Sequence, residues 1–285
     1  MDSEVPVHGR GDALCSPSNL SALVEAVRAS TKYRDVSQEL ISRVAAQELR
    51  KRRSVKEALK ATKNKLHQVG GAYLDTREHY ARWLEELSMA ARTGQRERLL
   101  ELCSTIMTYH ASSRERVPIL TQFYAQIFHE LPPVRTILDI ACGFNPLAIP
   151  WMPLAEEGLA IYYAYDIYHS MMDFLQAWLA IMCVEGSAQV CDVLQTCPTQ
   201  QADVAFLLKA IPCLEQVDKM AGRRLLRQIH ARNLVVSFPV QSLGGRSKGM
   251  LEHYEAHFRA LIGNEGKWEV KKLVFDTELV FVVKK

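Results

Sequence analysis

The pattern of the sequence changes after Leu131, where short β-rich runs begin to alternate with helical runs. The β-rich runs cover residues 134–140, 159–165, 188–191, 203–208, 234–238, 270–275 and 278–283. Helical patterns cover residues 170–184, 216–231 and 249–262. Such alternation predicts βαβ units, so we expect an α/β fold with a mostly parallel, Rossmann-like sheet of seven strands. The last two runs are separated only by Asp276 and Thr277, which is too short for a crossover and predicts an antiparallel C-terminal hairpin.

The region before this change has a helical pattern. From about residue 20 to residue 131, apolar residues recur at helical spacing, as in Val55, Leu59 and Leu66, and no strand is evident. Gly70-Gly71 and Thr93-Gly94 are expected helix ends. We therefore predict a flexible tail at residues 1–19, an all-helical domain at residues 20–131 and the α/β domain at residues 132–285.

The net charge of +3 is unevenly distributed along the chain. Residues 50–67 contain eight Lys or Arg residues and one acid, Glu57, whereas exposed helix faces usually mix both signs. One interpretation is the solvated side of an ordinary amphipathic helix. The excess of one sign favours a surface that binds a polyanion. The candidate residues, called the basic face below, are Arg52, Arg53, Lys56, Lys60 and Lys63.

Several other classes of protein and site are not expected. No run approaches the ~20 apolar residues of a membrane span, and residues 1–20 lack the pattern of a signal peptide. The seven cysteines are odd in number and no two have C-x-x-C spacing, which argues against a disulfide framework and a Cys-type zinc site. His253 and His257 have i, i+4 spacing, but no third metal ligand is evident. We expect a cytoplasmic monomer with no metal and no membrane partner.

Candidate ligand-binding residues follow the strands, because sheets of this kind bind ligands at the carboxyl ends of their strands. The first turn contains one glycine, Gly143, where a dinucleotide-binding loop needs three. S-adenosylmethionine has no pyrophosphate and needs only a tight turn, an acid for the ribose hydroxyls and a polar group near the adenine. Gly143, Asp166 and Asp192 stand at successive strand ends and fit these roles. The structural alternatives are a helix N-cap for Asp166 and a turn for Asp192.

Longer stretches of the sequence carry a more specific signal. They include residues 110–116 (HASSRER), 139–146 (DIACGFNP), 203–209 (DVAFLLK), 242–250 (SLGGRSKGM) and 277–279 (TEL). From about Ser30 to the C-terminus, the chain resembles the aminoglycoside-resistance 16S rRNA guanine-N7 methyltransferases of bacteria. The fold that this resemblance implies, a Rossmann-like S-adenosylmethionine methyltransferase domain after a helical domain, agrees with the strand pattern.

The resemblance also implies roles for individual residues. Arg114 would pair with the methionine carboxylate of the cofactor, which suits a guanidinium fork, and the alternative is a surface ion pair with Glu115 or another neighbour. The expected cofactor-binding residues are Tyr73, His110, Ser112, Ser113, Arg114, Ala141, Gly143, Asp166, Asp192, Val193, Lys209 and Asp218. The residues expected to position the target base are Asn145, Pro146, Arg246, Lys248 and Met250. Arg246 and Lys248 are also expected to bind rRNA, together with the basic face.

The implied activity is methyl transfer from S-adenosylmethionine to N7 of a guanine in the decoding A site of 16S rRNA, leaving S-adenosylhomocysteine. The substrate would be the assembled small ribosomal subunit, and the outcome resistance to kanamycin- and gentamicin-type aminoglycosides. N7 has a lone pair and no proton, so we expect no general base and catalysis by proximity and orientation. Two other functions stay open: a small-molecule S-adenosylmethionine methyltransferase, and an inactive RNA-binding protein with the same fold. The basic face argues against the first, and the acidic strand ends argue against the second.

Overall fold

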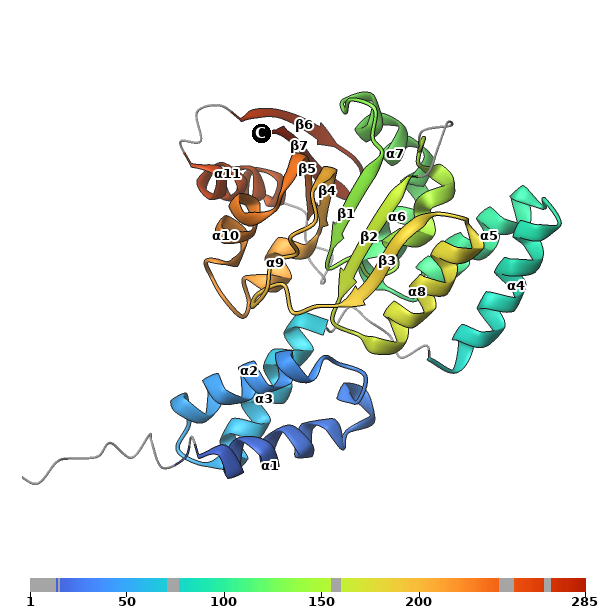
Figure 1. The fold of residues 1–285 in the computed structure, drawn as a ribbon. Coiled ribbons are helices and arrows are strands. Elements are labelled where there is room, and N and C mark those ends of the chain that lie inside the picture. Colours follow the sequence, from blue (N-terminus) through green and yellow to red (C-terminus); the bar gives the residue numbers. More distant parts are fainter. Residues whose placement is uncertain (1–13, 15, 71–76, 155–159, 241–248, 264–267) are drawn as a thin grey trace, which may run out of the picture. The chain divides into compact units, whose positions relative to one another are not determined.

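The computed structural model describes residue 14 and residues 16–70, 77–154, 160–240, 249–263 and 268–285 (Figure 1). The chain forms two compact units, residues 1–71 and residues 72–285, and each is described by itself. In the first unit the helices are α1 (Pro17–Arg28), the short η1 (Thr31–Tyr33), α2 (Gln38–Lys51) and α3 (Val55–Gly70). None of the helices in the described part of the chain is long and apolar enough to cross a membrane.

Helix α3 carries most of the basic face. It ends at Gly70, where the sequence predicts a helix end. Its buried side is formed by Ala58, Thr62 and Leu66, which follow one another at i, i+4 spacing. The predicted apolar side of this helix is therefore only partly confirmed, because Leu66 is buried whereas Val55 and Leu59 are half-buried.

The second unit contains a seven-stranded sheet with the order β3-β2-β1-β4-β5-β7-β6. The strands are β1 (Thr136–Ile140), β2 (Ile161–Asp166), β3 (Glu185–Val190), β4 (Ala202–Leu208), β5 (Ala231–Pro239), β6 (Glu269–Val274) and β7 (Glu278–Lys284). Strands β1 to β5 pair in parallel, whereas β7 is antiparallel to both β5 and β6. The Rossmann-like sheet and the C-terminal hairpin are confirmed. Strand β7, whose residues 279–283 are all apolar, is buried inside the sheet, and β6, which carries Glu269, Lys271 and Lys272, forms the edge of the sheet.

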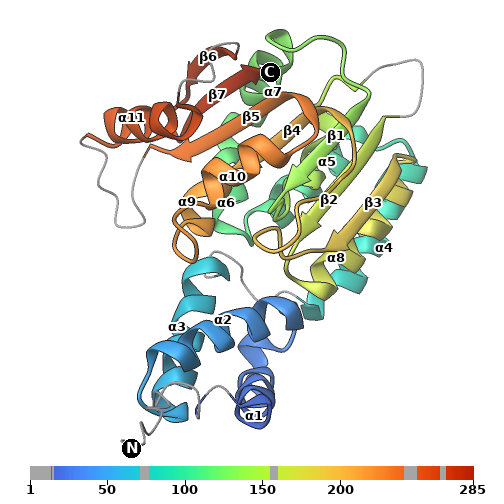
Figure 2. The same ribbon diagram turned by 60° about the vertical axis from the view of Figure 1, so that its left-hand side comes forward.

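Helices cover both faces of the sheet (Figures 1 and 2). One face carries α9 (Ala210–Leu214), α10 (Ala221–Gln228) and α11 (Met250–Ile262). The other carries α7 (Leu120–His129), α8 (His169–Ile181) and the 3-10 helix η4 (Asn145–Trp151), and outside these α4 (Tyr80–Arg92) packs on α8 and α5 (Arg96–Met107) on η4. Side chains alternate along a strand, so Leu138 and Ile140 of β1 join the core under α9 to α11 while Asp139 faces the opposite layer.

Helices α4 to α7 belong to the same compact unit as the sheet. The ring of Tyr80 on α4 stacks on Phe174 of α8, with 4.7 Å between ring centroids. Tyr124 of α7 is fully buried and donates a hydrogen bond to Asn145 at the start of η4. Because these helices bury aromatic side chains on the sheet layer, the compact units divide at residue 71 and not at the predicted residue 131. The docking role expected of residues 20–131 stays a prediction.

Candidate functional site

The loop after β1 makes a tight turn at the carboxyl end of the sheet. Ala141 and Gly143 have φ angles of +53° and +51°, in the left-handed region that L residues with a Cβ rarely adopt. The Cys142 N–H donates to the carbonyl of Tyr165 at 3.0 Å, which ties this turn to the end of β2. The predicted turn at Gly143 is therefore present, and the backbone is strained at Ala141, which has a Cβ.

Asp166, the last residue of β2, holds this loop in place. Its Oδ2 accepts a hydrogen bond from the Gly143 N–H at 2.8 Å, and its Oδ1 accepts one from the Ile167 N–H at 2.7 Å. Burial raises the pKa of Asp166, and the two backbone donors oppose that shift. Each carboxylate oxygen keeps a further lone pair, so Asp166 can also accept hydrogen bonds from ligand hydroxyls.

His110 lies directly over Gly143. A Cβ built on Gly143 would be 2.8 Å from Cε1 of the imidazole, so this position requires glycine. Burial, followed by the charges of Arg116, Lys209 and Arg114, lowers the pKa of His110 to about 4, and the ring is neutral near pH 7. Its buried Nδ1 has no hydrogen-bond partner among the residues that the structure describes. An unpartnered buried nitrogen beside a glycine turn fits a site that takes a polar ligand.

The short helix α6 (Ala111–Arg116) follows His110. Ser113 is buried and Ser112 half-buried. Arg114 is exposed, and within the described ranges it makes no ion pair, so its guanidinium is available for a carboxylate. The alternative pairing with Glu115 does not occur, because Glu115 accepts a hydrogen bond from Lys209 Nζ at 2.6 Å.

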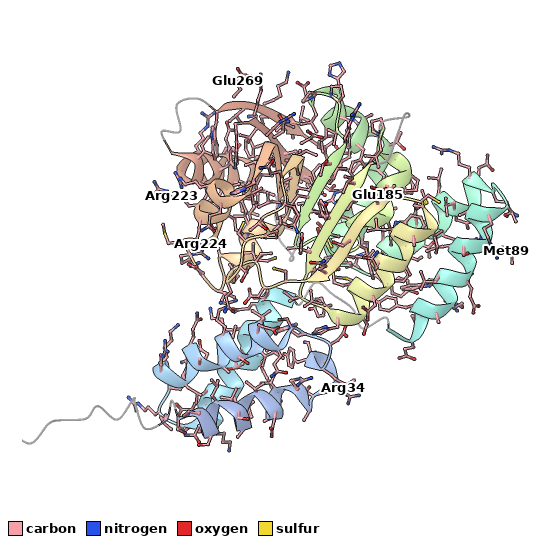
Figure 3. All side chains as sticks on the ribbon, viewed as in Figure 1. Arg34, Met89, Glu185, Arg223, Arg224 and Glu269 are labelled. Carbon is pink, nitrogen blue, oxygen red and sulfur yellow. The ribbon has the colours of Figure 1, made fainter. Side chains whose placement is uncertain are left out.

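Asp192 and Val193, expected beside the adenine, are linked to Asp218, another expected cofactor-binding residue, through Arg224. Asp192 and Val193 are buried after β3, and Asp192 Oδ1 accepts a hydrogen bond from the Leu194 N–H at 3.2 Å. Asp218 accepts a hydrogen bond from Arg224 Nη1 at 2.7 Å, and Arg224 Nη2 donates to the Leu194 carbonyl at 3.1 Å. Arg224, labelled on α10 in Figure 3, thus links Asp218 to the segment that follows Asp192.

Asn145 and Pro146 are placed differently from the expectation that they receive the target base. Asn145 is 1% exposed, and its Oδ1 accepts hydrogen bonds from Arg116 and Tyr124 while its Nδ2 donates to Asp139. Pro146 is buried. Both polar atoms of the Asn145 side chain are hydrogen-bonded to other residues of the protein, so Asn145 stabilises the loop after β1. The expected contact of Asn145 with a base is therefore corrected.

Two buried residues beside this loop had no role assigned from the sequence. Arg116 donates from Nε and Nη2 to the two carboxylate oxygens of Glu278, at 2.8 and 3.1 Å. The side chains are 1% and 0% exposed. Both belong to stretches that carry the resemblance, HASSRER and TEL, but no periodicity or spacing indicates that they form a pair.

One predicted cofactor-binding residue and two predicted base-positioning residues cannot be placed. Tyr73, Arg246 and Lys248 lie outside the described residues. Met250 is half-buried and begins α11, directly after Gly249, whose φ is +77°.

The basic face in the first unit is largely exposed. Arg52, Arg53, Lys56 and Lys60 are exposed and Lys63 is half-buried. Arg52 forms an ion pair with Glu48 at 2.8 Å. A shallow groove on this surface is lined by Arg52, Glu57, Lys60, Ala61, Asn64, Lys65 and Gln68.

The histidine pair on α11 is engaged in a contact within the protein. His257 Nε2 lies 2.7 Å from Oε2 of Glu215, and the ring of His253 stacks on His257 with 6.4 Å between centroids. Across the described ranges, no group of three or more His, Cys, Asp and Glu side chains could hold a metal ion.

Together, the sheet order, the antiparallel hairpin and the turn held by an acid at the end of β2 define a Rossmann-like S-adenosylmethionine methyltransferase. The chain matches the family described as "Ribosomal RNA methyltransferase (FmrO)" over residues 29–282, and it belongs to that family.

Two relatives are similar to this chain over nearly their whole length. The 16S rRNA (guanine(1405)-N(7))-methyltransferase of Micromonospora rosea is 36% identical, over 93% of this chain and 97% of its own. The enzyme of the same name from Serratia marcescens is 32% identical, over 94% and 99%. Among solved structures, the 16S rRNA methyltransferase RmtF in complex with S-adenosyl-L-homocysteine has a TM-score of 0.81 at 28% identity, covering 95% of this chain and 99% of its own.

Proposed function

We propose that this protein methylates N7 of a guanine in the decoding A site of 16S rRNA within the assembled small ribosomal subunit, and so gives resistance to kanamycin- and gentamicin-type aminoglycosides. The observation that carries this proposal is the 36% identity, over 93% of the chain, to a relative named for guanine-N7 methylation of 16S rRNA. The methyl donor is S-adenosylmethionine, which supplies an electrophilic methyl group on a sulfonium when bound.

Residues at the carboxyl ends of the strands would each bind a different part of this donor. Asp166 would accept hydrogen bonds from the ribose, while its contact with the Gly143 N–H keeps the turn closed. Arg114 would hold the amino-acid carboxylate, and Asp192 with Val193 would flank the adenine. A neutral His110 adds no positive charge beside a cationic ligand, which its pKa of about 4 ensures at pH 7.

The reaction requires positioning and no proton transfer in the attacking step. Guanine N7 attacks through its own lone pair, so holding it in line with the methyl group can supply about 7–11 kcal/mol of the barrier. The target guanine has to leave its stack to be reached, and Met250, Arg246 and Lys248 are proposed to receive it. The basic face is proposed to dock the subunit through rRNA phosphates.

Transfer of a labelled methyl group tests this function directly. The purified protein and labelled S-adenosylmethionine are incubated with small subunits, with free 16S rRNA and with an extract free of ribosomes, and labelled rRNA is mapped by mass spectrometry of nuclease fragments. We expect one N7-methylated guanine in the subunit sample, and raised drug tolerance of cells that express the protein. Label in small molecules of the extract would favour the small-molecule enzyme, and binding of subunits without any transfer would favour the inactive RNA-binding protein.

A further inference from the structure

Glu278 is a fully buried carboxylate at the functional edge of the sheet. It is the first residue of β7, which runs antiparallel to β5, so Glu278 pairs with Pro239 at the carboxyl end of β5. Its Oε2 accepts a hydrogen bond from Ser237 Oγ at 2.7 Å, and Oε1 lies 3.4 Å from Lys209 Nζ. With the two hydrogen bonds from Arg116, this one carboxylate joins α6, β4 and β5.

Lys209 and Arg116 extend these contacts to Glu115 of α6 and to the loop after β1. Lys209 follows β4 with a φ of +57°, and its Nζ donates to Glu115 of α6 at 2.6 Å. Arg116 Nη1 donates to Asn145 Oδ1 at 2.9 Å, which reaches the loop after β1. Helix α6 is therefore tied to β4 through Glu115 and to β7 and the β1 loop through Arg116.

Stability alone does not account for so many buried charges. Buried ion pairs often contribute less than apolar side chains of similar volume would, because desolvation offsets their attraction. In addition, α6 has six residues, and a helix of that length is not stable by itself in water. Its position therefore depends on these anchors, and its own residues include Ser113 and Arg114.

We propose that Glu115, Arg116, Lys209 and Glu278 are positioning residues that hold α6 so that Arg114 faces the carboxylate of the amino-acid end of the cofactor. The inference rests on the proposed function only for the nature of this ligand. Glu115 and Arg116 are directly after Arg114 in sequence and are both anchored, whereas Arg114 has no ion-pair partner in the described part of the chain. The contacts of Glu115 and Arg116 fix the backbone that follows Arg114 and do not involve the Arg114 guanidinium, which can therefore bind the ligand.

The variant Glu115→Gln tests this proposal without disturbing the core, because the Glu115 side chain is 42% exposed. Calorimetric titration uses two probes: S-adenosylhomocysteine, which has the carboxylate, and 5′-methylthioadenosine, which lacks the whole amino-acid end. We expect the dissociation constant for S-adenosylhomocysteine to rise about tenfold, the equivalent of one charge-assisted hydrogen bond, and that for 5′-methylthioadenosine to stay the same. In methyl transfer, KM for S-adenosylmethionine should rise while KM for subunits is unchanged.

Glu255→Gln is the matched control. Glu255 accepts a hydrogen bond from Lys272 at 2.8 Å in the same unit, so the change of charge is identical, and neither dissociation constant should change. Glu278→Gln then removes the charge of the central carboxylate. It should weaken the binding of S-adenosylhomocysteine more than Glu115→Gln does. The inference is overturned if Glu115→Gln binds S-adenosylhomocysteine with unchanged affinity, or if its affinity for both probes falls by the same factor. Failure of the wild-type protein to bind either probe overturns the proposed function, and the inference with it.

Discussion

Replacement of Gly143 by alanine tests how tightly the cofactor turn is built. Gly143 has a φ of +51°, and an L residue in the left-handed region costs about 1–2 kcal/mol. The new Cβ would also be 2.8, 3.0 and 3.1 Å from three atoms of the His110 ring, and relief of such overpacking typically costs a further ~1–3 kcal/mol. The free energy of unfolding should therefore fall by about 2–5 kcal/mol. Affinity for S-adenosylhomocysteine should fall too, because the imidazole has to move.

Gly94→Ala is the matched control for the backbone contribution. Gly94 has a φ of +66°, and no atom of the described residues lies within 4 Å of a Cβ built at that position. Urea denaturation at pH 7 should show a loss of about 1–2 kcal/mol for Gly94→Ala, with cofactor affinity unchanged. In a protein that already carries His110→Ala, Gly143→Ala should cost no more than Gly94→Ala, since the ring is gone. An equal cost of Gly143→Ala with and without the imidazole would refute the steric argument.

Three further predictions concern the donor site, the basic face and pH. Asp166→Ala should weaken S-adenosylhomocysteine binding by about 1–3 kcal/mol in calorimetry, because a buried N–H of Gly143 and the ribose lose their acceptor; wild-type affinity would remove Asp166 from the site. Reversing the charges of Arg52, Arg53, Lys56 and Lys60 should weaken subunit binding and flatten its salt dependence while cofactor affinity stays constant; normal binding at ~0.15 M salt would mean that the face is merely solvated. Burial raises the pKa of Asp139 to about 6 from an ordinary 3.8, so the folded chain binds a proton that the unfolded chain lacks, and acidification from pH 6 to pH 4 favours folding at this group. His110 acts oppositely, because its pKa is lowered from 6.5 to about 4. Relative to the wild type, Asp139→Asn should therefore lose about 2 kcal/mol of stability as the pH falls from 6 to 4 in urea denaturation, and parallel pH profiles would contradict the assignment.

Features that depend on local pattern could be predicted from the amino-acid sequence. Alternating β-rich and helical runs predicted the parallel sheet, and the link at Asp276 and Thr277 required a hairpin, because two residues cannot cross a sheet. Gly143 and Asp166 were identifiable because ligands bind where parallel strands end. The short helices α9 and η4 escaped prediction, since five and seven residues are too few to establish a periodicity.

The pairing of buried polar groups became visible only in the folded chain. Arg116 and Glu278 are 162 residues apart in sequence, and no local signal pairs them. Asn145 was expected to contact a base, but it is buried and stabilises the cofactor turn. Burial also joined α4 to α7 with the sheet, moving the boundary between compact units from residue 131 to residue 71. The physical reason is the same in each case: a buried polar group must find its partner in space, and an apolar helix face packs on whichever surface covers it, whatever the distance along the chain.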